Sequence, residues 1–359
     1  MARGSTAGAR RSGRAPTLAT VAREAGVSRQ TVSNALNSPH LLRPETLERV
    51  RRAVESLGYS PNRAARNLRT RSSHLIGLRV DRVVEGTANA TMDRFLHSLV
   101  ESSKDAGYHV LLFSSGVDAG EGAEDGRVDE DLAVAGYDDL LRSTAVDAFV
   151  ITDTYRGNPQ AGWLEERGAP FVAFGRPWDE PAAAHPWVDV DGRTGVMLAV
   201  DHLVDRGHER IAWVGWQKSS FIGEDRRTGW ADAMHGHGLS TSRLSARGDD
   251  TLDFGRRAAQ ALLENERPSA FVCVSDTVAM GVLHALAEQG LAPGRDIAVV
   301  GFDDSIAAQV VPPGLTSVRQ PLEQVAVEIV NLLGQLLTHK PIDEPGLLLP
   351  PTLSVRGSS

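Results

Sequence analysis

Apolar residues at helical spacing dominate the first sixty positions of the chain. They predict one helix over 17–25, a second that starts at Ser28 and a third over 44–57. Thr17 and Ser28 have side chains that can cap the first two helices, and Gly26 can end the first. Because the second helix follows the first after a short turn, the pattern predicts an all-α head with a helix-turn-helix.

The polar segment SPNRAARNLRTR follows, from Ser60 to Arg71. It can start a short helix, but a helix of this length and polarity is not stable by itself. We therefore expect a hinge helix that folds only against a partner surface and acts as a switch. Residues 1–16, rich in Gly, Ala, Ser and Arg, are expected to form a disordered basic tail.

A different pattern begins at Leu75. Seven short apolar runs are expected to be strands: LIGLRV, HVLLF, DAFVIT, PFVAF, RIAWVGW, SAFVCVS and DIAVVGF. Segments with helical spacing accompany them, including MDRFLHSLVESSKDAG, GVMLAVDHLVDRG, DFGRRAAQALLENE, TVAMGVLHALAEQG and EQVAVEIVNLLGQLL. Continuous apolar strands separated by helices are typical of parallel sheets covered on both faces. The sequence thus predicts an α/β body of two parallel-sheet lobes, with ligands bound in a crevice at the carboxyl ends of the strands.

Charge separates the head from the body. Residues 1–73 contain 14 Arg, no Lys and four Glu, a net charge of +10, whereas the whole chain carries −8, so the rest carries −18. A polyanion is attracted to the first part and repelled by the second. The second predicted helix also carries Arg29, Gln30 and Asn34, whose side chains can pair with guanine or adenine. We predict that the head binds DNA; for this helix alone, the alternative is a solvated face on an ordinary helical hairpin.

Several other classes of protein are disfavoured. Cys273, the only cysteine, lies in the apolar run AFVCV, so we expect a buried structural thiol and a reducing cytoplasm. No segment approaches the roughly 18 apolar residues of a membrane span. A Walker loop, GxSxG, HExxH and a dinucleotide fingerprint are all missing, so neither an enzyme nor a cofactor is expected. The HGH sequence at 235–237 has no third ligand nearby and is expected to be solvated.

The stretches VAREAGVSRQTVSNALN, PETLERV and LGYSPNRAARNLR resemble the lactose/galactose repressor (LacI/GalR) family of transcription regulators, from about Thr17 to the C-terminus. The resemblance implies base contacts by the second helix, and a hinge helix that pairs in a dimer and drives Leu68 into the minor groove. The implied DNA-binding residues are Thr17, Ser28, Arg29, Gln30, Thr31, Ser33, Asn34, Asn37, Asn62 and Leu68. Many relatives have Arg at the position of Asn34, so we expect an adenine contact here in place of a guanine contact. Arg43 stands where a Ser or Thr cap is common and is a possible phosphate contact.

For the body, the resemblance implies a fold like that of periplasmic sugar-binding proteins, with an effector held between two hinged lobes. The implied effector-binding residues are Asp81, Arg176, Arg226, Ser275, Asp276 and Asp303. Two alternatives stay open: Arg226 could form a surface ion pair with Asp225 or Glu224, and Asp276 could be a helix N-cap. Asp250 occupies the position of an aromatic stacking residue in many relatives, and Phe254 or Trp187 could replace it.

His202 and His208 match a structural motif of the family. The acidic stretch over 116–139 is interpreted as a solvated loop that leads into a helix at Tyr137 to Leu141. The predicted organisation is a tail over 1–16, a helix-turn-helix domain over 17–60, a hinge helix and linker over 61–73, and an effector-binding and dimerisation domain over 74–359.

Together these features predict a cytoplasmic homodimer that represses carbohydrate genes from a palindromic operator and is released by a sugar. A corepressor such as a purine is the alternative within this class. A transport-type sugar-binding protein would need an export signal and no basic head, and an enzyme would need a catalytic motif.

Overall fold

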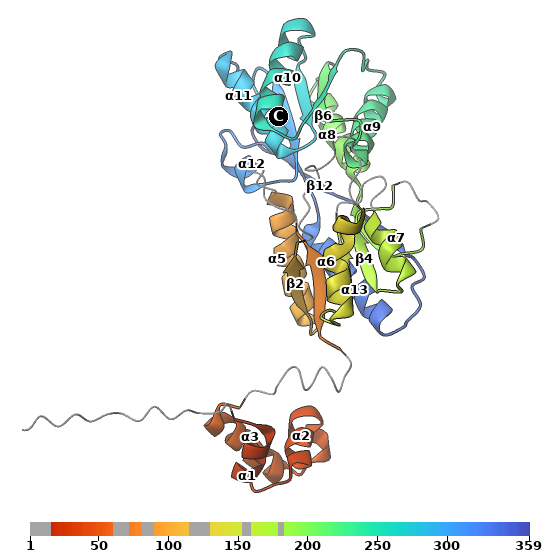
Figure 1. Ribbon diagram of the computed structural model, residues 1–359. Coiled ribbons are helices and arrows are strands. Elements are labelled where there is room, and N and C mark those ends of the chain that lie inside the picture. The colour runs from red at the N-terminus through yellow and green to blue at the C-terminus, as the bar shows by residue number, and fades with distance from the viewer. Residues whose placement is uncertain (1–15, 60–71, 81–89, 115–129, 153–158, 179–182) are drawn as a thin grey trace, which may run out of the picture. The chain divides into compact units, whose positions relative to one another are not determined.

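The computed structural model describes residues 16–59, 72–80, 90–114, 130–152, 159–178 and 183–359, and its contacts divide the chain into a head, residues 1–72, and a body, residues 73–359. Figure 1 labels the α-helices of both units and some strands of the body. Most of the predicted tail and most of the predicted hinge lie outside the described ranges.

Three α-helices make up the described part of the head: α1 (Leu18–Glu24), α2 (Arg29–Asn37) and α3 (Pro44–Leu57), with a 3-10 turn, η1 (Pro39–Leu41), before α3. The predicted caps are confirmed. Thr17 and Thr20 form a reciprocal capping box at α1, and the Ser28 hydroxyl accepts the Thr31 main-chain N–H over 3.0 Å at α2. Gly58 ends α3 with φ 58°. Local side-chain hydrogen bonds therefore fix where α1 and α2 begin.

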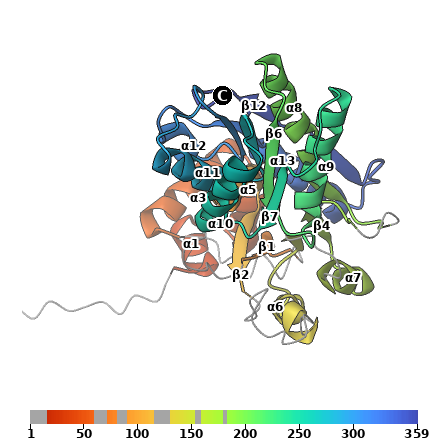
Figure 2. The same cartoon turned by 90° about the horizontal axis from the view of Figure 1, so that it is seen from above.

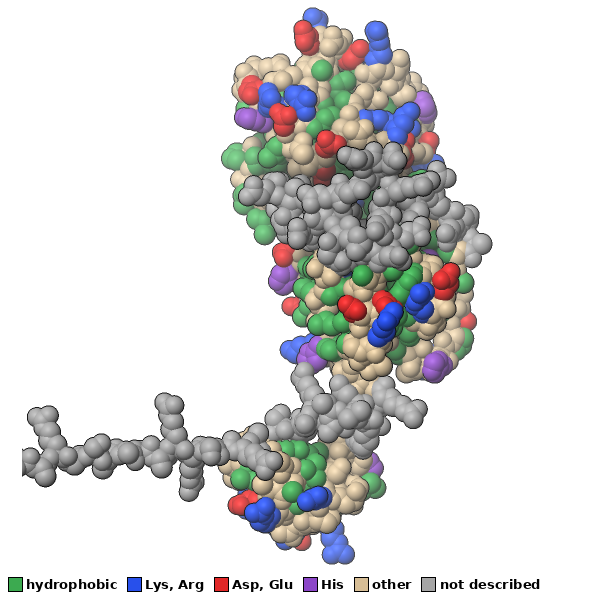
Figure 3. Space-filling view, viewed as in Figure 1, with side chains coloured by type: hydrophobic (Ala, Val, Ile, Leu, Met, Phe, Trp, Pro, Cys, Tyr) green, Lys and Arg blue, Asp and Glu red, His purple; other side chains and the backbone are tan. Residues whose placement is uncertain are grey.

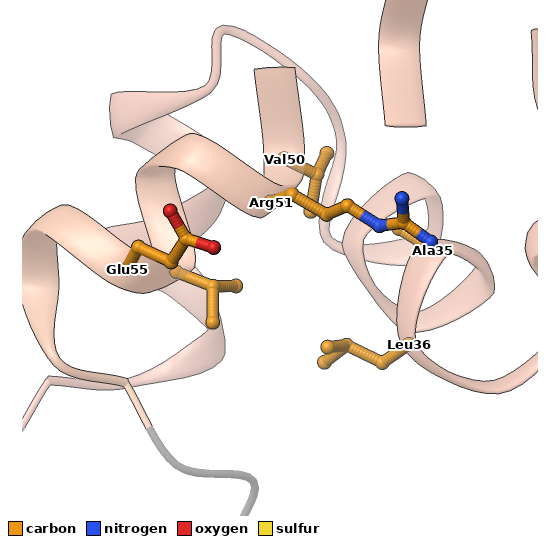
Figure 4. Close-up of a pocket in the computed structure, with 6 residues that line it drawn as sticks. Ala35, Leu36, Val50, Arg51 and Glu55 are labelled. Atoms are coloured by element: carbon orange, nitrogen blue, oxygen red, sulfur yellow. The ribbon is translucent and has the colours of Figure 1, made fainter. Parts of the chain in front are cut away.

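The core of the head is small. Its buried side chains are Val21, Ala22, Ala25, Val32, Val50, Ala53 and Tyr59. Arg43 is the N-cap residue of α3 and makes no capping hydrogen bond, so this turn lacks the acceptor that Ser or Thr would supply. A hollow between α2 and α3 is lined by Ala35, Leu36, Val50, Arg51, Val54 and Glu55 (Figure 4). The side chains of the two helices leave a gap there.

The first lobe of the body is built on a parallel sheet with the strand order β11–β5–β4–β3–β1–β2. Its strands are β1 (Leu75–Arg79), β2 (His109–Phe113), β3 (Ala148–Ile151), β4 (Phe171–Phe174), β5 (Trp187–Val190) and β11 (Gly346–Leu349). Helices α5 (Ala90–Asp105) and α13 (Leu322–Leu337) cover one face, and α6 (Glu130–Arg142) and α7 (Pro159–Glu166) cover the other. Both faces are apolar, as continuous hydrophobic strands require.

The second lobe repeats this plan with the strand order β12–β10–β9–β8–β6–β7. Its strands are β6 (Ile211–Trp216), β7 (Ser245–Gly248), β8 (Ala270–Cys273), β9 (Ala298–Phe302), β10 (Thr316–Arg319) and β12 (Thr352–Ser354), of which β12 alone runs antiparallel to its neighbour. Its helices are α8 (Gly192–Asp205), α9 (Phe221–Gly236), α10 (Leu252–Asn265), α11 (Asp276–Glu288) and α12 (Ile306–Val310). The predicted α/β body of two parallel-sheet lobes is confirmed.

The described chain passes between the lobes at three places, from β5 to α8, from β10 to α13 and from β11 to β12. Figure 2 shows the same elements from above. Each lobe keeps its own hydrophobic core on either side of these three crossings. None of the helices in the described part of the chain combines the length and apolarity that a bilayer crossing needs.

The seven predicted strands are confirmed as β1, β2, β3, β4, β6, β8 and β9. Polar or short strands such as β7 (SARG) and β10 (TSVR) were not predicted, because their sequences lack an apolar run. The boundary predicted at Tyr137 is wrong, since α6 begins at Glu130. Tyr137 is buried, and its hydroxyl donates to Gln160 Oε1 over 3.2 Å, so this part of the acidic stretch is packed rather than solvated.

Candidate DNA-reading helix and effector cleft

Several polar side chains of α2 bond to the helix itself. The hydroxyls of Ser28 and Thr31 lie 2.9 Å apart at the cap. Asn37 Nδ2 donates to the Ser33 carbonyl oxygen over 2.7 Å. These four residues, expected to contact the DNA backbone, therefore also set the local structure of the helix. Val32 is the buried residue of α2 and holds its opposite face against the core.

The three residues expected to contact bases are arranged differently. Gln30 Nε2 donates to Asn34 Oδ1 over 3.0 Å, which joins side chains one helical turn apart. Arg29 is exposed and forms no ion pair or hydrogen bond with any residue that the structure describes. The other two residues expected to contact DNA, Asn62 and Leu68, lie outside the described ranges.

In the second lobe, side chains that follow the carboxyl ends of neighbouring strands come together. Arg226 belongs to α9, which follows β6; Ser275 and Asp276 follow β8, and Asp303 follows β9. Because β6, β8 and β9 are parallel neighbours, their carboxyl ends share one edge of the sheet. The structure thus brings these four predicted effector residues to the edge where ligands of such folds bind.

Arg226 is buried, with 6% of its surface exposed. Its guanidinium carbon lies 3.6 Å from the ring centre of Phe302, and Nη1 donates to the Val274 carbonyl oxygen over 2.7 Å. Burial lowers the pKa of this guanidinium, and among the nearby charges that of Asp303 does most to raise it again. The surface ion pair considered from the sequence is wrong: Arg226 is an interior cation held on an aromatic ring.

Asp303 occupies a strained position at the end of β9. Its φ is 112°, outside the conformations that a side chain normally permits. Its Oδ1 accepts from Gln320 Nε2 over 2.7 Å. Burial raises the pKa of the Asp303 carboxyl to about 7; Arg226 opposes that rise, and Asp276 adds to it. The carboxyl therefore faces the interior with one hydrogen bond that the fold supplies.

Arg176 brings the first lobe into the site. Its Nε donates to Asp189 Oδ2 over 2.6 Å, and Nη2 lies 3.6 Å from Asp225 Oδ2 in α9 of the second lobe. Its guanidinium carbon lies 4.3 Å from the ring centre of Trp178. Burial raises the pKa of Asp225, and the Arg176 charge lowers it. Cationic and acidic groups from both lobes thus meet at this site.

Ser275 and Asp276 have contacts within the second lobe. Ser275 is the N-cap of α11, and its hydroxyl donates to Asp250 Oδ1 over 2.5 Å. Asp276 accepts from the Ser317 hydroxyl over 2.6 Å and from the Ser305 main-chain N–H over 2.7 Å. Burial raises the pKa of Asp276, while these hydrogen bonds lower it. The capping residue is therefore Ser275, and the Asp276 carboxylate ties α11 to the segments after β9 and at β10.

Three buried N–H donors of the cleft have no partner among the described residues: Trp178 Nε1, Trp216 Nε1 and Arg226 Nε. Trp178 stacks on Phe221, the first residue of α9, with centroids 6.1 Å apart and planes 11° apart. Neither aromatic residue was predicted from the sequence. Trp216 ends β6 and Trp178 lies in the segment that follows β4, and this placement at the ligand edge of a parallel sheet was the available signal.

A family model described as "Bacterial regulatory proteins, lacI family" matches residues 17–62, and a periplasmic binding protein-like domain matches residues 200–359. The HTH-type transcriptional regulator CelR of Thermobifida fusca is 33% identical over 353 residues, which cover 96% of this chain and 98% of the relative. The chain belongs to the lacI family. This lacI-family protein is a DNA-binding transcriptional regulator.

Two solved structures extend the comparison over the same length. The structure titled as a CelR–cellobiose complex is 30% identical, with a TM-score of 0.70, and covers 96% of this chain and all of that chain. A lac repressor dimer bound to operator and the anti-inducer ONPF is 26% identical, with a TM-score of 0.79, and covers 96% of this chain and 99% of that chain. This chain therefore has the same fold, over nearly its whole length, as a regulator solved with cellobiose and one solved with operator DNA.

The remaining candidates have other places in the fold. Phe254 packs against Gly248, and Trp187 packs over Gly346 at the start of β5, away from the carboxyl ends of the strands. Trp187 therefore offers no stacking surface at the ligand edge, whereas Gly248 is the last residue of β7 and its contact places Phe254 at the carboxyl edge of the second sheet. His202 Nε2 lies 2.9 Å from Ser359 Oγ, in keeping with a structural role, and burial lowers the pKa of His202. Asp81 lies outside the described residues.

Proposed function

We propose that this regulator is a repressor of carbohydrate genes that a small sugar releases from a palindromic operator. The observation that carries the sugar proposal is the composition of the cleft. Buried N–H donors of Trp178, Trp216 and Arg226 have no described partner, and the charges of Asp303, Asp189, Asp250 and Asp225 act on Arg226. Sugar hydroxyls both donate and accept hydrogen bonds, so one ligand can satisfy both sets. The CelR relative solved with cellobiose supports this choice.

The proposed effector contacts fall into two groups. Arg226, Asp303 and Arg176 would bind the ligand directly, while Ser275 and Asp276 would hold the edge of the sheet in place. Asp81 is retained as a proposed contact of the first lobe. Trp178 and Trp216 join the set as aromatic surfaces for a sugar ring, which has apolar C–H faces.

We propose that α2 enters the major groove, with Arg29, Gln30 and Asn34 toward the bases. Ser28, Thr31, Ser33, Asn37, Thr17 and Asn62 are proposed as backbone contacts, and Leu68 as the minor-groove wedge. A helix-turn-helix of this size needs two copies to build a specific interface. The lac repressor relative was solved as a dimer on its operator.

The second copy has a suitable surface to cover. On α12, Ile306 and Val310 are 76% and 71% exposed, and Figure 3 shows hydrophobic side chains gathered over this helix. Figures 1 and 2 both place α12 beside α5, where Val100 is exposed. We propose that this surface forms the homodimer interface, because exposed apolar residues in one patch mark contact sites.

We further propose a cytoplasmic protein without a cofactor or enzymatic activity. The relatives are named as transcriptional regulators. Buried Cys273, whose pKa is raised strongly by burial, is unsuited to act as a nucleophile, because the reactive form is the thiolate. Among the described residues no group of three or more His, Cys, Asp or Glu could hold a metal ion.

The proposed function is tested with the full-length protein in two steps. Thermal shift with glucose, maltose, cellobiose, adenine and hypoxanthine identifies the effector class, since a ligand at 100 times its Kd stabilises by about 2.7 kcal/mol. The positive compound is then titrated into a complex with DNA recovered by selection. Release by a sugar supports the proposal. Stabilisation by a purine alone, or tighter DNA binding with the ligand, would replace the sugar inducer by a corepressor.

A further inference from the structure

The polar face of α2 has an internal order that bears on how it reads DNA. Ser28 and Thr31 use their hydroxyls at the helix cap, and Asn37 donates to the Ser33 carbonyl oxygen. Gln30 and Asn34, by contrast, are bonded to each other, Nε2 to Oδ1, over 3.0 Å. Residues four apart share one face of a helix, so the two amides point to the same side.

This hydrogen bond fixes which groups each amide can offer to a base. The Asn34 carbonyl accepts from Gln30, and the two amide N–H groups of Asn34 have no partner among the described residues. Gln30 keeps its carbonyl and one N–H. Adenine offers an N6–H donor and an N7 acceptor in the major groove, so Gln30 can bind it with its carbonyl and its remaining N–H.

We propose that Gln30 and Asn34 read two operator positions as one bonded unit, in which Gln30 selects adenine and Asn34 selects a base with major-groove acceptors. Guanine, with N7 and O6, and thymine, with O4, fit a donor of this kind. The inference rests on the proposed DNA-reading role of α2, and it changes the base expected for Asn34 from the sequence, which was adenine. Arg29 lies outside the unit because its side chain has no bond to either amide.

The bond also makes the two positions dependent on each other. An amide held by its neighbour presents one arrangement of donor and acceptor, whereas a free amide can rotate and present either. Removing Asn34 therefore costs Gln30 part of its preference for adenine, although Gln30 itself is unchanged. A single neutral hydrogen bond of this kind corresponds to a change of about threefold to tenfold.

The test uses full-length protein and selection from randomised duplex DNA, followed by titration of single-base variants of the recovered site. Gln30→Ala identifies the position that Gln30 reads. Asn34→Ala should then lower the adenine preference at that same position by about threefold to tenfold. Asn34→Asp should preserve that preference, since its carboxylate still accepts from Gln30, while the acceptor-base preference at the Asn34 position is lost. Arg29→Ala is the matched control and should leave the adenine preference of Gln30 intact.

Three outcomes separate the coupling from the DNA-reading role itself. Recovery of a specific site, with an adenine preference at the Gln30 position that falls in Asn34→Ala, supports the bonded unit. Specific DNA in which Asn34→Ala leaves the Gln30 position unchanged, or in which the Asn34 position selects adenine, overturns the unit but keeps the proposed role of α2. Recovery of no specific DNA by the wild-type protein overturns both.

Discussion

Gly255 in α10 and Gly281 in α11 face each other where the two helices cross. A Cβ at Gly255 would lie 2.2 Å from the Val278 carbonyl oxygen, and one at Gly281 would lie 2.2 Å from the Leu252 carbonyl oxygen. Real side chains do not approach main-chain oxygens so closely, so the helices can touch only because both residues are glycine. This crossing holds α11, whose first turn carries Ser275 and Asp276, against the rest of the second lobe.

We expect Gly281→Ala to destabilise the protein by about 1–3 kcal/mol, because the added methyl group must push two backbones apart. Gly334→Ala is the matched control: Gly334 is also helical, in α13, but nothing lies within 4 Å of its Cβ position. That change should be neutral or stabilise by roughly 0.5–1 kcal/mol. Urea unfolding of the three proteins measures both values. Equal effects of the two substitutions would contradict the close packing at the crossing.

The fold was largely predictable because its signals are local. LIGLRV and AFVCV predict buried strands, and Ser28 and Gly58 mark helix ends by their own chemistry. Strand β7, SARG, was not predictable, because it has no apolar run and lies at the edge of the sheet beside β6. Its pairing depends on a neighbour distant in the sequence, which a local pattern does not record.

The cleft was less predictable, for a related reason. Arg226 and Asp303 stand out in the sequence by their matched positions in the family. The role of Asp276 depends on Ser317, forty-one residues later, and only the folded sheet brings the two together. Trp178 and Trp216 became candidates only when the fold had buried their N–H groups without a described partner. Unsatisfied donors are a property of the packed structure and have no sequence signature.

The pH dependence of stability should report on Asp303. Its folded pKa, about 7, lies above the 3.8 of a free side chain. As pH rises from about 4 to about 7, the unfolded chain ionises while the folded carboxyl stays neutral, so the wild type loses stability over this window. Asp303→Asn keeps a neutral acceptor for Gln320 and should avoid this loss. The advantage of the variant should therefore grow from pH 5 to pH 8, to on the order of 2 kcal/mol.

Urea unfolding at pH 5, 6.5 and 8 measures this difference directly. Asp276, which is also buried with a raised pKa, is present in both proteins, so its contribution cancels in the comparison. Parallel stability profiles for the wild type and the variant would show that Asp303 titrates at the same pH in the folded and unfolded states.

Substitution of Arg226 should separate effector response from DNA binding. Arg226→Met retains an unbranched chain against Phe302 but removes the charge and the donors, including the Nε that has no described partner. A hydrogen bond from a charged donor contributes about 1.5–3 kcal/mol, so effector affinity should fall by roughly 10- to 150-fold. Operator affinity without effector should be unchanged, because the head keeps its own core.

Isothermal titration with the identified sugar and operator titration with the same preparation measure the two affinities. Arg227→Met is the matched control, since the neighbouring Arg227 pairs with Glu224 rather than with the buried ring. An Arg226→Met protein that still releases DNA at the wild-type effector concentration would place the effector elsewhere.

The exposed apolar surface of α12 predicts how self-association can be broken. Val310 is 71% exposed, whereas Ala308, in the same helix, is fully buried, so a charge at 310 should disturb the surface and leave the fold intact. In a symmetric dimer Val310→Glu would bring the same charge from both copies into one interface, and we expect roughly 100-fold weaker self-association. Leu198→Glu on α8, also exposed, is the control and should not change self-association.

Sedimentation at several protein concentrations measures the monomer–dimer equilibrium. Operator affinity should fall in parallel with the loss of dimer, because specific recognition needs two heads on one site. A monomeric variant with full operator affinity would show that the second copy contributes nothing to DNA binding.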